Sequence, residues 1–395
     1  MRRFLPVLVL QSLVAISLTF TAAIFLVAGL GTRKLRRLAD ISDRPIDNPP
    51  FLSVVIAARQ EATHLRATLT ALLAQSYPTF EVVLVNDRST DATGSIAEEM
   101  ARADSRLQVV HVTSLPAGWL GKTHAMHTGA AQARGEYLLF TDADVVFAPG
   151  TLTRAMRLVA QEKVDHLAVL PCITSPSRIL RWSVGAFSIF FLLFTRAWQV
   201  ANSRSRASIG IGAFNLVRTS VYRAAGGHEP IRLRPDDDLR LGRLLKSRGA
   251  RAAVWRSAGM VEVDWYPSVR ALIHGMEKNS FAALDYRVGA AVSSVASQLL
   301  YAAAFLVPLW VTGPLRVVVL MDLAVMVAAS AAAARLVRQP AWSALLQPLV
   351  LPFMAWVQAR AVVLTLRRGG IEWRDTFYPL SELRGEARAK ARAYD

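Results

Sequence analysis

Cysteine is nearly absent from this chain of 395 residues, because Cys172 is its only example. A single thiol excludes an intramolecular disulfide framework. Cys172 follows an apolar stretch that is typical of a strand, so a small buried side chain is a better interpretation than a nucleophile. The cysteine content is compatible with a cytosolic active domain and does not by itself require one.

Acidic residues are also scarce relative to basic ones. The sequence has 46 Lys and Arg against 29 Asp and Glu, which gives a formal net charge of +17. Many of the basic residues adjoin apolar segments, as Arg33, Lys34, Arg36 and Arg37 do. Because no nucleic-acid-binding module is visible, we predict contact with anionic headgroups rather than with nucleic acid. A solvated arginine-rich surface is the alternative interpretation.

The apolar residues gather at the two ends of the chain. Residues 5–30 are almost wholly apolar, and this run is longer than the roughly 20 residues that cross a bilayer. It also exceeds the apolar core of a signal peptide, so we predict a retained anchor over residues 1–35. Further candidate spans lie in residues 286–366, and a basic tail follows at 367–395.

Basic residues after the first span outweigh Arg2 and Arg3 before it. The positive-inside tendency therefore predicts a multi-pass protein of the inner (cell) membrane with a cytoplasmic catalytic domain. The C-terminal spans are expected at 288–311 and 315–334. A third segment, 341–366, is interrupted by prolines and polar residues, so its crossing and the side of the tail stay open. The apolar stretch at about 179–200 is expected to lie in the membrane interface.

Residues 50–285 have the pattern of an α/β domain. Apolar, β-branched runs predict strands at 51–57, 80–85, 107–112 and 137–141, and helical spacing predicts helices between them at 62–75, 90–103 and 122–133. Strands that alternate with helices indicate a mainly parallel sheet. Ligands bind such sheets beyond the carboxyl ends of the strands, where Asp87 and Asp142 are expected.

Several side chains near these strand ends suit the chemistry of a charged donor. Asp142 and Asp144 could reach a divalent cation together, although a turn or a helix cap explains the same spacing. Lys122 opens a predicted helix, where a cation and the helix N-terminus both favour phosphate. Asp237 and Asp238 stand at another helix start, either as a general base with its neighbour or as partners of the helix dipole.

Five short motifs in one order carry a resemblance to a known family. They are Arg59-Gln60-Glu61, the run from Asn86 to Asp91, Gly121-Lys122, Asp142-Ala143-Asp144, and the run from Asp237 to Gly242. In this strand context the chain resembles the family 2 glycosyltransferases with the GT-A fold, whose Rossmann-like sheet is mainly parallel. The resemblance implies inverting transfer of a sugar from a nucleotide sugar, usually UDP-linked, with Mg²⁺ or Mn²⁺.

The resemblance also implies roles for single residues. Asp238 would be the catalytic base supported by Asp237, although which of the two is the base stays open. Asp144 would bind the metal, and Asp87 the nucleobase. The remaining donor-side residues would be Ala57, Arg59, Glu61, Lys122 and Asp142. Gly212 and Trp265 would lie on the acceptor side.

The membrane spans make the chain most similar to bacterial enzymes that glycosylate lipids, such as ceramide glucosyltransferases and the carotenoid- or hopanoid-associated enzymes. Two departures matter. Gln60 stands where the family usually has Asn, and the Gln-x-x-Arg-Trp block of processive synthases is absent from the sequence. We therefore expect a single transfer to a hydroxyl of a lipid acceptor. Transfer to polyprenyl phosphate and a noncatalytic nucleotide-binding scaffold are the alternatives.

Overall fold

The computed structural model describes residues 4–374 and 376–385. The chain forms two compact units. The sheet unit contains residues 35–174, 199–265 and 381–385, and the helical unit contains residues 4–34, 175–198 and the described part of 266–380. Each unit is interrupted in sequence by segments of the other, so neither is a simple N- or C-terminal domain.

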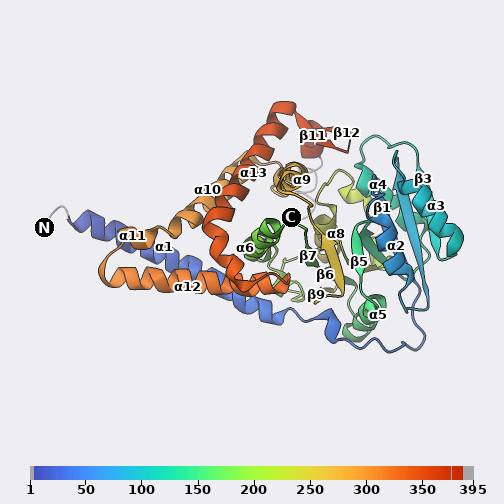
Figure 1. The fold of residues 1–395 in the computed structure, drawn as a ribbon, viewed down its shortest axis with the longest axis horizontal. Helices are drawn as coiled ribbons and strands as arrows, with labels where there is room; N and C mark the ends of the chain where they lie inside the picture. The colour runs from blue at the N-terminus through green and yellow to red at the C-terminus, as the bar shows by residue number, and fades with distance from the viewer. Residues whose placement is uncertain (1–3, 375, 386–395) are drawn as a thin grey trace. The chain divides into compact units, whose positions relative to one another are not determined.

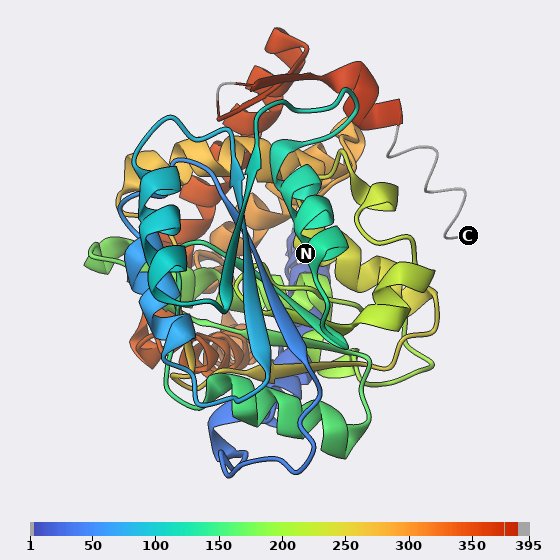
Figure 2. The ribbon, with the colours of Figure 1, turned by 90° about the vertical axis from the view of Figure 1, so that its right-hand side faces the viewer.

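The sheet unit is built on a seven-stranded sheet with the order β3-β2-β1-β4-β8-β6-β9. The strands are β1 (Leu52–Ala58), β2 (Phe80–Asp87), β3 (Leu107–Val112), β4 (Tyr137–Asp142), β6 (His166–Leu170), β8 (Asn215–Arg218) and β9 (Ala252–Arg256). Strands β3, β2, β1 and β4 run parallel, and only β8 is antiparallel to its two neighbours. The predicted, mainly parallel sheet is confirmed (Figure 2).

The central strands are buried along almost their whole length. Val54, Val55 and Ile56 of β1 have no exposed surface, nor do Val82 to Val85 of β2. Parallel strands covered on both faces have this continuous apolar character. The helices that connect them are α2 (Leu65–Leu73), α3 (Thr93–Ala103), α4 (Gly121–Gln132) and α5 (Thr151–Glu162), and α8 (Asp237–Ser247) follows later. All four predicted strands and all three predicted helices are present.

A second sheet has three strands in the order β5-β10-β7. These are β5 (Val145–Phe147), β7 (Cys172–Thr174) and β10 (Val261–Asp264). Cys172 is buried here as a free thiol, with its Sγ 3.4 Å from Ser257 Oγ. The prediction that this cysteine is a small buried side chain is confirmed.

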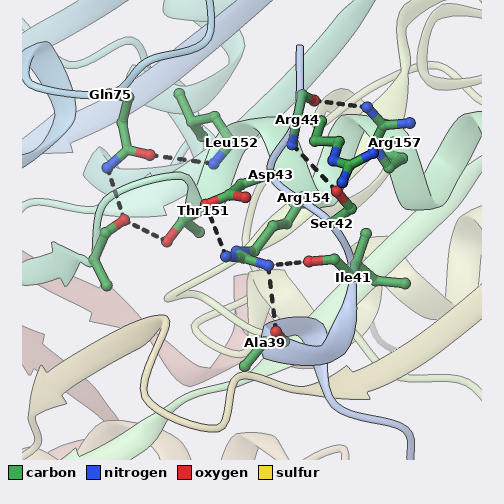
Figure 3. A network of polar contacts seen from close by, with 11 residues as sticks. Ala39, Ile41, Ser42, Asp43, Arg44, Gln75, Thr151, Leu152, Arg154 and Arg157 are labelled. Atoms are coloured by element: carbon green, nitrogen blue, oxygen red, sulfur yellow. Dashed lines mark hydrogen bonds and ion pairs between the residues drawn. The ribbon is translucent and has the colours of Figure 1, made fainter. Parts of the chain in front are cut away.

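The segment before β1 is held against α5 by two arginines (Figure 3). Arg154 donates to the carbonyls of Ala39 and Ile41, and its Nη2 lies 2.9 Å from Asp43 Oδ2. Arg157 donates to the carbonyl oxygens of Arg44 and Pro45 at 2.6 and 2.9 Å. Five acceptors on one short stretch of chain fix how the polypeptide enters the sheet unit.

The helical unit holds apolar helices from both ends of the sequence. They are α1 (Phe4–Gly31), α6 (Arg178–Thr195), α10 (Val288–Ala304), α11 (Val307–Trp310), α12 (Gly313–Leu336) and α13 (Gln347–Arg368), joined by the more polar α9 (Val269–Ala282) and the β11–β12 hairpin (Gly370–Trp373, Thr376–Pro379). Four segments of the described residues are long and apolar enough to cross a membrane: Val7–Lys34, Arg178–Gln199, Gly313–Leu336 and Ala341–Arg368. These segments indicate association with a membrane.

Helix α6 groups with the helical unit, although its sequence lies between two segments of the sheet unit. One side chain at the start of α13 joins α6 to two other helices of this unit. Gln347 has no exposed surface, and it donates to Ala186 O of α6 at 3.1 Å and to Ser330 Oγ of α12 at 2.7 Å. It also accepts from Tyr301 OH of α10 at 2.8 Å. Buried polar contacts of this kind hold helices together where burial of apolar surface alone cannot.

Candidate functional site

Two aspartates lie at the carboxyl ends of neighbouring parallel strands. Asp87 is the last residue of β2, Asp142 is the last residue of β4, and β1 runs between them. Ala57 of β1 pairs with Asp142 in the sheet register, which places this predicted donor-side residue beside the β4 carboxylate. The convergence expected from the sequence pattern is therefore present at the edge where such sheets bind ligands.

Lys122 joins the acids of two different elements. It is the second residue of α4, and its Nζ lies 2.7 Å from Asp142 Oδ1 and 3.5 Å from Asp237 Oδ1. Burial alone would lower the pKa of Lys122, but Asp142, Asp237 and Asp238 outweigh it and raise the pKa. The ammonium is thus a permanent cation between the end of β4 and the start of α8.

Asp238 is held in one orientation by backbone amides. The N–H of Gly212 donates to Asp238 Oδ2 at 2.8 Å, and the N–H of Leu239 donates to Oδ1 at 2.8 Å. Burial raises the pKa of Asp238, while the charge of Lys122 opposes that rise. A fixed carboxylate with increased basicity has the properties of a general base.

Gly212 lies between Asp142 and Asp238. A Cβ added at this position would lie 2.6 Å from Asp142 Oδ2 and 3.5 Å from Asp238 Oδ2. Only a residue without a side chain fits between these carboxylates in their present positions. The sequence motif suggested an acceptor-side role for Gly212, and the structure adds this packing requirement.

Asp144 interacts electrostatically with two further acids, Asp142 and Glu61. Burial, together with the charges of Asp142 and Glu61, raises the pKa of Asp144 to about 7. Asp144 Oδ1 is buried and has no hydrogen-bond partner within the described part of the chain. A buried oxygen in this state is costly, and a hard divalent cation would satisfy it.

The protein offers this cation only part of a coordination shell. Across residues 4–374 and 376–385, no group of three or more His, Cys, Asp or Glu side chains is placed to hold a metal ion. Mg²⁺ in proteins is often held by one or two carboxylates together with substrate phosphates. The acids near Asp144 fit a cation that arrives with, or is completed by, a phosphorylated ligand.

Asp87 is neutralised by arginines. Arg88 Nε and Nη2 donate to its two carboxylate oxygens at 2.7 and 2.9 Å, and Arg59 Nη1 lies 3.8 Å from Oδ2. A Cβ on Gly121 would lie only 2.4 Å from Asp87 Oδ2, so the glycine lets the carboxylate approach the start of α4. Contact of Asp87 with a nucleobase stays a prediction.

Gln60 has a role that the sequence motif did not indicate. Its backbone is left-handed, with φ of 57°, and its Oε1 accepts from the N–H groups of Thr90 and Asp91 at 2.8 and 3.2 Å. Gln60 N also donates to Ser89 Oγ at 3.1 Å. Gln60, which stands where the family usually has Asn, therefore links the loop after β1 to the loop after β2.

Asp236 lies outside this acid cluster despite its place in the Asp236-Asp237-Asp238 run. Arg234 Nε and Arg240 Nε lie 2.9 and 2.7 Å from its carboxylate oxygens. Although burial acts in the opposite direction, these two arginines lower the pKa of Asp236. Its ion pairs fix the turn before α8 and leave the two following aspartates to face Lys122 and Gly212.

Trp265, the other predicted acceptor-side residue, lies just after β10. Its N–H donates to Thr174 O at 3.2 Å, which extends the pairing of β10 with β7. An acceptor role for its ring stays a prediction. The residues that sequence reasoning missed, Gln60 and the glycine contacts, act through packing and backbone hydrogen bonds that no motif spells out.

Comparison with known proteins gives a family for most of this region. The family described as glycosyltransferase like family 2 matches residues 49–282, more than half of the chain. A putative glycosyltransferase, EpsH of Bacillus subtilis, is 32% identical over 113 residues, which are 29% of this chain and 31% of the relative. The chain thus spans about a third of the length of that relative.

A second curated relative and one solved structure extend the comparison. The β-monoglucosyldiacylglycerol synthase of Nostoc sp. is 27% identical over 194 residues, covering 48% of this chain and 40% of the relative. A mannosyltransferase from Pyrobaculum calidifontis, solved with GDP-Man and Mn²⁺, is 18% identical with a TM-score of 0.48, covering 98% of this chain and 92% of that one.

Proposed function

The chain belongs to glycosyltransferase like family 2, and from that premise we propose that it is an inverting, non-processive glycosyltransferase with a lipid acceptor. The donor would be a nucleotide sugar, with UDP as the expected nucleotide. The observation that carries the proposal is the meeting of Asp142, Asp237 and Asp238 around Lys122, with Asp144 beside them. This meeting supports a single site in which the proposed donor-side acids and the proposed base would act together.

On the donor side, Asp144 would hold Mg²⁺ or Mn²⁺, with Asp142 next to it. The bound cation would offset the negative charge that develops on the departing nucleotide. The buried, unpartnered Oδ1 of Asp144 supports this assignment. Asp87, with Arg59 and Arg88 against it, would lie against the nucleoside.

On the acceptor side, Asp238 would take the proton of a hydroxyl as its oxygen attacks the anomeric carbon from the face opposite the leaving group. The hydrogen bond from Gly212 keeps the carboxylate aimed in one direction. Burial raises the pKa of Asp238, which favours proton uptake, and the charge of Lys122 limits that rise. Asp237 holds Lys122 in place from the same turn of α8.

The lipid acceptor and the cytoplasmic location rest on different support. A glycolipid synthase is among the relatives, and four segments of the described chain are long enough to cross a bilayer. Basic residues directly after the first span favour a cytoplasmic sheet unit. The acceptor would therefore be presented from the inner face of the cell membrane.

A direct experiment tests both the class of reaction and the base. The purified full-length chain would be incubated with a panel of UDP-sugars, Mg²⁺ or Mn²⁺ and total membrane lipid, and mass spectrometry would identify any lipid that gains a hexose. Asp238→Asn should keep donor binding and lose transfer, whereas Asp47→Asn, an exposed control, should keep both. Normal turnover by Asp238→Asn would refute the assignment of the base.

Two alternatives have their own signatures in the same experiment. An acceptor such as polyprenyl phosphate is already an anion and needs no strong base, so its transfer would survive the loss of Asp238. A noncatalytic scaffold would bind UDP without releasing it from any UDP-sugar.

A further inference from the structure

A cationic cluster lies in the helical unit, outside the residues given roles above. Glu277 of α9 is its centre and forms an ion pair with Arg360 of α13. Arg368 Nη1 approaches the other carboxylate oxygen to 3.6 Å, and His274 Nδ1 lies 3.3 Å from Oε1. One carboxylate therefore faces two guanidinium groups and an imidazole.

The charges of this cluster do not balance. Two arginines against one glutamate leave a positive excess even with His274 neutral, and the exposed Arg367 adds to it in the last turn of α13. Lys278, next to Glu277, places its Nζ 4.0 Å from the centre of the Trp373 ring in the β11–β12 hairpin. Figure 1 shows α9 beside α13 and this hairpin, so the cations come from two neighbouring helices and the hairpin adds an aromatic ring.

The place of the cluster along α13 indicates what it faces. Arg368 is the last residue of the segment Ala341–Arg368, which is long and apolar enough to cross a bilayer. Val363 and Leu366, just before it, expose apolar side chains, and Phe377 of the hairpin does so as well. Basic and aromatic residues directly after an apolar span are typical of the headgroup region.

We propose that Arg360, Arg368 and Lys278, with Arg367 beside them, bind the phosphate of an anionic glycerophospholipid headgroup. A guanidinium group can donate two parallel hydrogen bonds to two phosphate oxygens. A cluster of cations next to a membrane span attracts anionic lipid. Glu277 has two effects. It holds the arginines in place, and it competes with the phosphate for them. The site is a lipid-binding site separate from the acids around Lys122.

The competition gives predictions of opposite sign for two variants. Removing one arginine near an anionic membrane surface weakens attraction about fivefold, so Arg368→Gln should lower the preference for phosphatidylglycerol over phosphatidylcholine by about that factor. Glu277→Gln removes the competing carboxylate and should raise the preference. A misfolded variant loses binding and cannot gain it, so the gain is the more telling result.

The measurement uses the full-length protein in nanodiscs with equal amounts of the two lipids. Native mass spectrometry would count the lipids that stay bound, and Arg223→Gln, an exposed arginine of the sheet unit, is the matched control. Equal preferences in Arg368→Gln and Arg223→Gln would overturn the proposal, as would a loss in Glu277→Gln. Inorganic phosphate is added in a parallel arm. Efficient displacement of the lipid by free phosphate would show a soluble-anion site instead. None of these readouts requires sugar transfer, so their outcome is independent of the proposed enzymatic activity.

Discussion

Gly212→Ala adds one methyl group between the carboxylates of Asp142 and Asp238. The new Cβ would lie 2.6 Å from Asp142 Oδ2, whereas ordinary van der Waals contact begins at 3.4 Å. The carboxylate must therefore retreat by about 0.8 Å, the difference between the two distances. Asp142 is bound to Lys122 at 2.7 Å, so its retreat disturbs the cation that also faces α8.

The expected effect is on turnover rather than on folding. A misplacement of about 1 Å in a reacting geometry can cost about a hundredfold in rate. The clash is with the end of a side chain and not with backbone, and the φ of Gly212 lies outside the left-handed region. We therefore expect kcat to fall about a hundredfold with little change in the thermal unfolding temperature.

Two other glycines make a graded control series. At Gly289, in the first turn of α10, an added Cβ meets nothing within 4 Å, so Gly289→Ala should leave turnover unchanged and should not lower the unfolding temperature. At Gly210, an added Cβ would lie 1.9 Å from the backbone oxygen of Asp238, so Gly210→Ala should lower stability as well as turnover. The assay measures hexose transfer from the donor and the unfolding temperature of each variant in the same detergent.

The reasoning is refuted if Gly212→Ala keeps wild-type turnover while it stays folded. That result would mean that the positions of Asp142 and Lys122 tolerate a shift of this size, and the site would then not depend on their contact. A variant that unfolds like Gly210→Ala would instead show that the methyl group meets backbone.

Two further perturbations test the electrostatics of the site, and a third tests a buried histidine of β6. Lys122→Met removes a cation from buried Asp237. We expect the free energy of unfolding, measured by chemical denaturation, to fall by about 3 kcal/mol, and we expect transfer to be lost. If neither changes, the contact is unimportant. Asp144→Asn should raise the Mg²⁺ or Mn²⁺ concentration needed to restore transfer after chelation; an unchanged requirement would argue against this ligand. Burial of His166 lowers its pKa to about 4 in the folded protein. The same histidine takes up a proton below about pH 6.5 in the unfolded chain. The free energy of unfolding should therefore fall between about pH 6.5 and pH 4, by up to about 3 kcal/mol. His166→Gln should flatten this acid-side fall in unfolding temperature, and an unaltered slope would contradict it.

Sequence periodicity was sufficient for β1 to β4, four of the seven strands of the large sheet. The strand expected at 107–112 is β3 to the residue, and the aspartates expected at two strand ends are the last residues of β2 and β4. These features depend on local runs of β-branched residues, which a sequence displays directly. The GT-A assignment likewise rested on motifs that lie next to those strands, and the family match confirms it.

Features that depend on distant contacts could not be predicted in the same way. The apolar run of α6 showed that this helix is hydrophobic, but not that Gln347, about 160 residues later, would bind its backbone. The link that Gln60 makes between two loops also depends on a distant contact, because its side-chain carbonyl accepts from Thr90 in the loop after β2. Neither partner is visible in a pattern of apolar and polar residues, because each contact is made by a single polar atom.

The run Asp236-Asp237-Asp238 shows how neighbouring residues of one type acquire different roles. Side chains at the start of a helix point in successive directions about its axis, so three adjacent aspartates cannot share one partner. The spacing of Asp236 and Arg240 does contain a signal, because residues four apart on a helix face each other. That pair marks Asp236 as structural and leaves its two neighbours for the site.

The resulting charge balance gives a physical reason for a divalent cation. Lys122 already neutralises part of the charge of Asp142 and Asp237, and Arg59 and Arg88 are engaged by Asp87. A nucleotide diphosphate would bring further negative charge to acids that include Asp144, whose pKa of about 7 reflects crowding and burial. Like charges that are close together in a buried site are strongly unfavourable. A donor of the proposed kind would therefore have to bring its own cation, and the buried Oδ1 of Asp144 is where the protein would meet it.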